Sequence, residues 1–109
     1  MANTYKILGQ ISPSATTETT LYTVPSLRST VCSSMSICNR GSVQTTFRIS
    51  FSQAGSATSN KDYIYYDVTL AANDTFIATI GVTLATTDVI RVYAGNANLS
   101  FQVYGTEIS

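Results

Sequence analysis

Apolar and polar residues alternate along most of this chain, with the period of two that a β-strand imposes on its two faces. The clearest case is the stretch 45–52, in which Phe47, Ile49 and Phe51 share one side while Arg48 and Ser50 share the other. This pattern predicts a strand with one face in a hydrophobic core and one face in water.

The same period predicts seven further strands, at residues 5–11, 17–24, 31–38, 63–70, 75–82, 88–94 and 99–104. Turn-forming residues such as Asn, Gly, Pro, Asp and Ser lie between them, and no segment has a helical stripe. Eight short strands with this spacing predict an all-β chain. We expect one domain over residues 1–109, an eight-stranded antiparallel β-sandwich that is jelly-roll-like or immunoglobulin-like.

Two details of this prediction concern single segments. In the strand 31–38, the face with Val31, Met35 and Ile37 is expected in the core, and the face with Cys32 and Cys38 opposite to it. The longest connection, 53–62, is rich in small and polar residues, and we expect an exposed, mobile loop there.

Hydroxyl groups, and few charges, supply the polarity of the chain. It has 17 Thr and 14 Ser, only 11% charged residues, and six basic residues that cancel six acidic ones. The 44% of hydrophobic residues argues against disorder. A neutral surface has no electrostatic attraction for nucleic acid or anionic lipid, so neither is expected as a partner. Weakly charged surfaces repel each other little, so such molecules tend to associate. This favours a protein whose surface is buried against partners in an assembly.

The ends and apolar stretches of the sequence give no targeting signal. Residues 1–10 lack a charged region followed by a long apolar run, so a secretory signal is not expected. No apolar stretch approaches the roughly 20 residues of a membrane helix.

The residue types needed for catalysis are scarce. The chain has no histidine, which removes the commonest general base and metal ligand. No serine lies in a G-x-S-x-G context, and the six carboxylates fall in separate predicted turns and strand ends. We therefore expect no enzyme, no catalytic residue, no cofactor and no metal site.

The two cysteines, Cys32 and Cys38, lie in one predicted strand. Six residues of extended chain span about 20 Å, too far for a disulfide, which needs Cα atoms within about 7 Å. Buried or half-buried free thiols are expected, and a disulfide between subunits stays open as the alternative.

The tyrosine-rich segment 63–67 is the most unusual feature of the sequence. Alternation places Tyr63 and Tyr65 together on the outer face, close to Lys61. One interpretation is an aromatic pair that stabilises the sheet. The other is an interface or ligand contact made by Tyr63, Tyr65 and Lys61, for example with a glycan, because tyrosine is enriched at binding surfaces. One lysine is too few for nucleic-acid stacking.

Several segments together carry a resemblance to a known group of proteins. They are TLYTVP at 20–25, VCSSMSICNR at 31–40, KDYIYYD at 61–67, ANDT at 72–75, TDVIRVYAG at 87–95 and the ending 99–109. In this order they resemble small virion proteins of tailed bacteriophages. The resemblance covers almost the whole chain, and its motifs are structural, so no functional residue is carried over.

The resemblance implies a structural protein of the virion, made without a signal peptide in the cytoplasm of the host bacterium. It implies a place in the tail, fibre or baseplate, or as a capsid decoration or cement protein. Such proteins assemble with themselves, often as trimers, and with other virion proteins. A carbohydrate-binding or host-surface-binding module is the alternative function.

Overall fold

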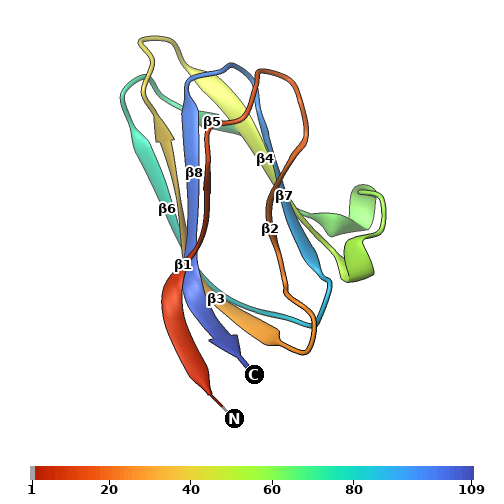
Figure 1. Ribbon diagram of the computed structural model, residues 1–109. Coiled ribbons are helices and arrows are strands. Elements are labelled where there is room, and N and C mark those ends of the chain that lie inside the picture. Colours follow the sequence, from red (N-terminus) through yellow and green to blue (C-terminus); the bar gives the residue numbers. More distant parts are fainter. Residues whose placement is uncertain (1) are drawn as a thin grey trace.

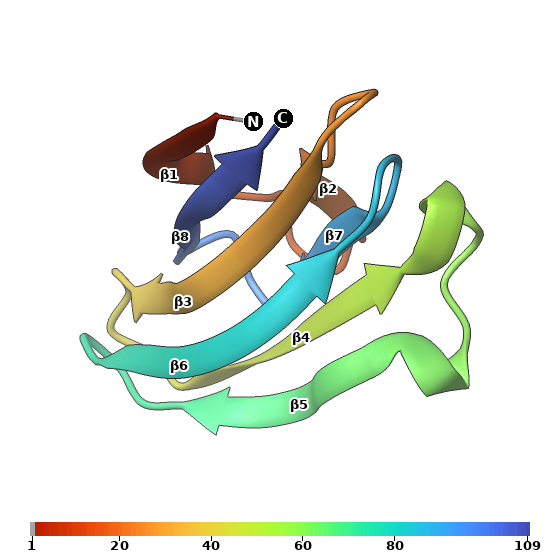
Figure 2. The same ribbon diagram turned by 90° about the horizontal axis from the view of Figure 1, so that it is seen from below.

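The computed structural model describes residues 2–109, whose strands form two antiparallel sheets facing each other across one hydrophobic core (Figure 1, Figure 2). The strands are β1 (Asn3–Ile11), β2 (Thr19–Thr23), β3 (Ser29–Asn39), β4 (Thr45–Ser52), β5 (Tyr63–Leu70), β6 (Thr75–Leu84), β7 (Val89–Ala94) and β8 (Leu99–Ile108). The strand orders are β1-β8-β3-β6 and β2-β7-β4-β5. The expected eight-stranded antiparallel β-sandwich is confirmed.

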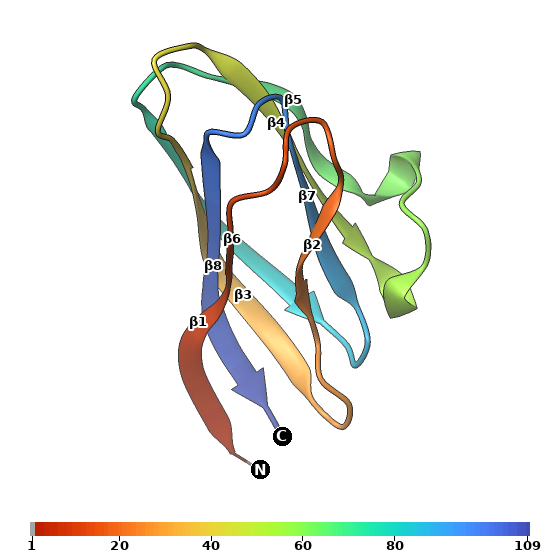
Figure 3. The same ribbon diagram turned by 45° about the horizontal axis from the view of Figure 1, so that its top comes forward.

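The strand pairing is that of a jelly roll. β1 pairs with β8, β2 with β7, β3 with β6 and β4 with β5, as in one long hairpin. Rolling this hairpin around a core adds the pairs β3–β8 and β4–β7, which complete the two sheets. Because β1 and β8 are paired, the start of β1 and the end of β8 lie at the same end of the sandwich (Figure 3). Of the two sandwich types expected, the structure has the first.

An aromatic cluster forms the centre of the core. Phe47 of β4 and Phe101 of β8 are fully buried, and their ring centres lie 6.3 Å apart across the two sheets. Phe76 of β6 packs 5.5 Å from Phe47. Burying one such side chain stabilises the fold by roughly 1.5–3 kcal/mol. The inward side predicted for β4 is thus the core side, since Ile49 is also fully buried. The expectation that the other side faces water is wrong at Ser50, which is 1% exposed.

Strand β3 changes its inward side part-way along its length. Cys32 is fully buried before the change and Met35 and Ile37 after it, whereas Val31 is half-buried. The register against β8 shifts between Cys32 and Ser34. The extra residue of such a β-bulge turns every later side chain to the other face. The expected core position of Val31 and outer position of Cys32 are therefore wrong.

The segment 53–62 contains two short 3-10 helices, η1 (Gln53–Gly55) and η2 (Asn60–Asp62), and projects beside β4 and β7 (Figure 1). Arg91 of β7 donates hydrogen bonds of 2.7–3.2 Å to carbonyl and hydroxyl oxygens of this segment. Asp88 accepts one of 2.9 Å from the backbone of η1. The segment is largely exposed, as expected, and it also contains short helical turns that Arg91 holds against β7 by hydrogen bonds. Neither 3-10 helix within residues 2–109 is long enough to cross a membrane.

A buried carboxylate links the two sheets at the end of the sandwich near the termini. Glu107 of β8 is 2% exposed and accepts a hydrogen bond of 2.6 Å from the Tyr22 hydroxyl of β2. Its other oxygen accepts hydrogen bonds from Arg28 at 3.0 Å and Lys6 at 3.3 Å. The hydrogen bond from Tyr22 is the largest cause that lowers the pKa of Glu107. Burial, with that carboxylate, raises the pKa of Tyr22 well above its usual range.

Candidate interaction surfaces

The structure separates the two tyrosines that were expected to share an outer face. The ring of Tyr65 points inward, 5.4 Å from Phe76 and 6.1 Å from Phe47. Two register shifts between β4 and β5, together with Asp67 at a φ of 52°, change the side to which β5 residues point. The expected position of Tyr65 on the outer face is wrong, because its ring packs against the core.

Tyr66 takes the outer position beside Tyr63. Their rings meet edge to face with centres 4.9 Å apart, and Tyr66 is 57% exposed. The Arg48 guanidinium lies 4.3 Å from the Tyr66 ring and 4.4 Å from the Tyr93 ring. It also forms an ion pair with Asp67, with Nε 2.6 Å from Oδ1. We call Arg48, Tyr63, Tyr66, Asp67 and Tyr93 the arginine–tyrosine face.

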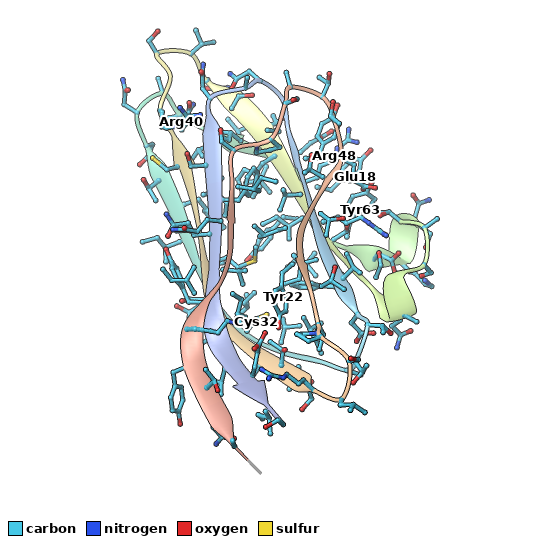
Figure 4. All side chains as sticks on the ribbon, in the orientation of Figure 1. Glu18, Tyr22, Cys32, Arg40, Arg48 and Tyr63 are labelled. Carbon is cyan, nitrogen blue, oxygen red and sulfur yellow. The ribbon has the colours of Figure 1, made fainter. Side chains whose placement is uncertain are left out.

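The arginine–tyrosine face lies on the outer side of the β2-β7-β4-β5 sheet, next to the segment 53–62. Figure 4 shows Arg48, Tyr63 and Glu18 on this side of the molecule. Glu18 accepts a hydrogen bond of 3.1 Å from Thr58 of the neighbouring segment. Two aromatic rings and one carboxylate hold the Arg48 guanidinium in place. These contacts join three neighbouring strands and stabilise the sheet.

Lys61 does not reach the tyrosines through any hydrogen bond of the structure. Its ammonium lies 3.1 Å from Asp62, a carboxylate that also accepts a hydrogen bond of 2.9 Å from the Ser59 backbone. The Ser59 N–H is the largest cause that lowers the pKa of Asp62. The lysine therefore helps to close the η2 turn, and the expected contact set of Lys61, Tyr63 and Tyr65 is not assembled in space.

The outer side of the other sheet has a different character, which we name the uncharged face. Cross-strand pairs place its members side by side, because residues directly opposite each other point to the same side. They are Tyr5, Ile7 and Gln10 of β1, Gln102, Tyr104 and Thr106 of β8, Val31, Ser34, Ser36 and Cys38 of β3, and Thr75, Ile77, Thr79 and Thr83 of β6. None of these residues, all within the described range 2–109, is charged.

The charged residues of these four strands point away from the uncharged face. They are Lys6 and Glu107, which bond to each other on the inner side. Among the exposed large apolar side chains, Tyr5, Ile7 and Ile77 lie on this face, with 78%, 50% and 69% of their surface exposed. Depletion of charge together with exposed aromatic and aliphatic groups is typical of the centre of a protein interface.

Three further features of the described chain concern its thiols, its carboxylates and one surface depression. Within residues 2–109, no three cysteine or carboxylate side chains are close enough together to hold a metal ion. Both cysteines are free thiols on opposite sides of β3, and burial raises the pKa of Cys32 to about 11. An open depression of about 260 Å³ lies between β1 and β8, lined by two glutamines, two serines, Ile11 and Phe101.

Comparison of the chain with models of protein families, with curated proteins and with solved structures finds no match.

The sequence predicts part of the arginine–tyrosine face and part of the uncharged face. Alternation places Arg48 outward on its strand, but it cannot align Arg48 with Tyr93 and Tyr66 across three strands. The uncharged face has a clearer signal, because strands 31–38, 75–82 and 99–104 contain no charged residue. Which of these strands are neighbours depends on the rolled topology, which alternation does not specify.

Proposed function

We propose that this chain is a structural module of a tailed-bacteriophage virion that acts by protein–protein assembly. The observation that carries the proposal is the uncharged face, an entire sheet surface without a charged side chain but with Tyr5, Ile7 and Ile77 exposed. Such a surface favours contact with another protein over free solution. The resemblance of the sequence to small virion proteins names the kind of assembly.

The jelly-roll fold agrees with this proposal without deciding it. Jelly rolls occur in viral capsid proteins and also in lectins, so the fold by itself is compatible with assembly and with sugar binding. The position in the particle, at the tail, fibre or baseplate or on the capsid, is left to experiment.

Mass spectrometry of purified particles from the phage that encodes the chain tests this proposal. The expected result is that the chain co-purifies with the particles at many copies each and survives a salt wash. Absence of the chain from particles, with abundance in the infected-cell lysate, would contradict a structural role.

A carbohydrate-binding function is the second candidate, and the arginine–tyrosine face is the observation that favours it. Tyr66 and its neighbour Tyr63 present aromatic edges and hydroxyls beside the segment 53–62. Tyrosine combines apolar area with a polar tip, which suits both glycans and proteins.

A glycan array with the wild type and two variants tests this second candidate. Tyr66→Ala removes the exposed ring, and Tyr5→Ala removes a tyrosine of the opposite sheet as the matched control. Binding that only Tyr66→Ala abolishes supports a glycan site. No binding by the wild type, or equal binding by all three proteins, rules against it.

A further inference from the structure

Strand β6 is an edge strand with an unprotected side. In the described part of the chain its one hydrogen-bonded neighbour is β3, so its other side presents backbone N–H and C=O groups to solvent. An exposed strand edge is a template for pairing with another strand, and proteins usually block it with charges, prolines, bulges or short length.

The other three edge strands carry such devices. β1 has Lys6 and a register shift after Ile7, and β2 is five residues long with a shift after Thr20. β5 has two shifts and Asp67 at positive φ. By contrast, β6 extends over ten residues without a charge or proline. Its register against β3 shifts between Thr79 and Val82, but its pairing is regular from residue 75 to 79, the part around Ile77.

We propose that β6 pairs with β6 of a second copy of this chain, antiparallel about a two-fold axis near Ile77. This inference rests on the proposed assembly function and identifies the first contact of that assembly. Such a pairing is self-complementary, because the same strand supplies both sides of an isologous interface. It joins two four-stranded sheets into one continuous sheet of eight strands.

The neutral edge of β6 disfavours a charged partner and is matched by the same edge of a second copy. A charged partner surface would lose hydration against the uncharged face without gaining an opposite charge. A second copy presents the same neutral edge, and pairing brings the 69% exposed Ile77 of each copy together on the outer side. Two isoleucines adjacent across a strand pair shield each other from water.

The area of the uncharged face gives a further reason. The four strands have 9, 11, 10 and 10 residues. At about 3.3 Å per residue and a spacing of about 4.8 Å between strands, they cover roughly 600 Å². A standard interface needs about 800 Å² from each partner. One copy is too small for this, whereas two faces joined through β6 offer roughly 1,200 Å² to the next protein of the particle.

Sedimentation equilibrium of the purified full chain over about 1–300 µM tests the pairing, at concentrations suited to a modest interface. We expect a monomer–dimer equilibrium in the wild type. Ile77→Lys places a charge beside the edge and should weaken the dimer at least tenfold. Leu27→Lys is the matched control, because it replaces a 91% exposed apolar residue outside the face and should leave the dimer unchanged.

Amide hydrogen exchange separates a folding defect from a pairing defect. In the wild type, amides within 75–84 should become protected as concentration rises, while Ile77→Lys should keep the protection of β3 and β8 and lose this gain. A wild-type monomer at 300 µM, a trimer, or equal dimerisation of both lysine variants would overturn the proposal. A chain present in particles but monomeric in solution would contradict the pairing and leave the structural role intact.

Discussion

Glu107 is the residue whose surroundings deviate most from those of an ordinary surface carboxylate. It is almost fully buried, and each of its oxygens accepts at least one hydrogen bond. The donor side chains come from β2, from the connection before β3 and from β1. Burial of an unpaired carboxylate is costly, so these partners are what permit its position. Lys6 and Arg28 are 44% and 43% exposed, so water screens their share of the interaction.

Replacing Glu107 by Gln should lower the free energy of unfolding at neutral pH by about 2 kcal/mol, because the charged acceptor of Tyr22 is lost. The folded state lowers the pKa of Glu107 below its usual 4.5. Its stabilisation is therefore complete above that value and is lost as the pH falls through the folded-state pKa. Urea unfolding at about pH 7 and pH 3 should show that the variant loses less stability on acidification than the wild type.

Glu18→Gln is the control, since Glu18 is exposed and has one hydrogen bond to Thr58. It should match the wild type at both pH values. Equal pH dependence in Glu107→Gln and the wild type would contradict the role of the buried carboxylate.

Two neighbouring tyrosines should respond differently to truncation. Tyr65→Ala removes a ring that packs on Phe47 and Phe76, and should cost about 3 kcal/mol. Tyr66→Ala removes a 57% exposed ring and its contact with Arg48, at a cost of about 1 kcal/mol or less. Thermal unfolding of both variants measures the difference, and a larger effect from Tyr66→Ala would reverse the assignment of faces.

At the scale of elements, the sequence predicts where strands occur but not where they bulge. Strand β4 is predicted with its bounds and inward side, because it alternates without interruption. β3 and β5 are also placed correctly, yet half of their side chains change face at a bulge. The extra residue of a bulge does not change the local residue composition in a recognisable way. Alternation therefore could not assign Val31 and Tyr65 to the correct side of the sheet.

The bulge of β3 depends on a glycine in the neighbouring strand. A Cβ at Gly105 would collide with the carbonyl oxygen of Val31, so Gly105→Ala should destabilise the fold by about 2 kcal/mol or more. Gly81→Ala is the matched control, because a Cβ there meets nothing within 4 Å and reduces the freedom of the unfolded chain. It should be neutral or slightly stabilising. Chemical denaturation checks both, and equal effects would contradict the close approach.

The change of face in β3 also predicts different thiol reactivity. Cys32 is fully buried and its pKa is raised to about 11, whereas Cys38 is half-buried on the uncharged face. Alkylation of the native protein at about pH 8 should modify Cys38, and Cys32 only after unfolding. Mass spectrometry of the labelled peptides reads the result. Faster labelling of Cys32 in the native protein would place the bulge elsewhere.

At the scale of the whole molecule, the class of fold follows from the sequence but the two surfaces do not. Eight alternating segments with turn residues between them allow several sandwich connectivities, and only the pairs β1–β8 and β2–β7 distinguish a rolled hairpin. The pair β1–β8, together with β3–β8 and β3–β6, brings strands with uncharged outer sides from both ends and the middle of the chain into one sheet. The uncharged face is therefore formed by strands that are distant in the sequence. It cannot be recognised from any one of these strands alone.

Hydroxyl-radical footprinting of the chain in purified particles and in dilute solution tests most directly whether assembly covers the uncharged face. We expect oxidation of Tyr5 and Ile77 to fall at least fivefold in the particle, since both are well exposed in the single chain. Tyr66, on the opposite sheet, provides the internal comparison. Equal oxidation of Tyr5 and Ile77 in both states, or protection confined to Tyr66, would show that assembly does not cover the uncharged face.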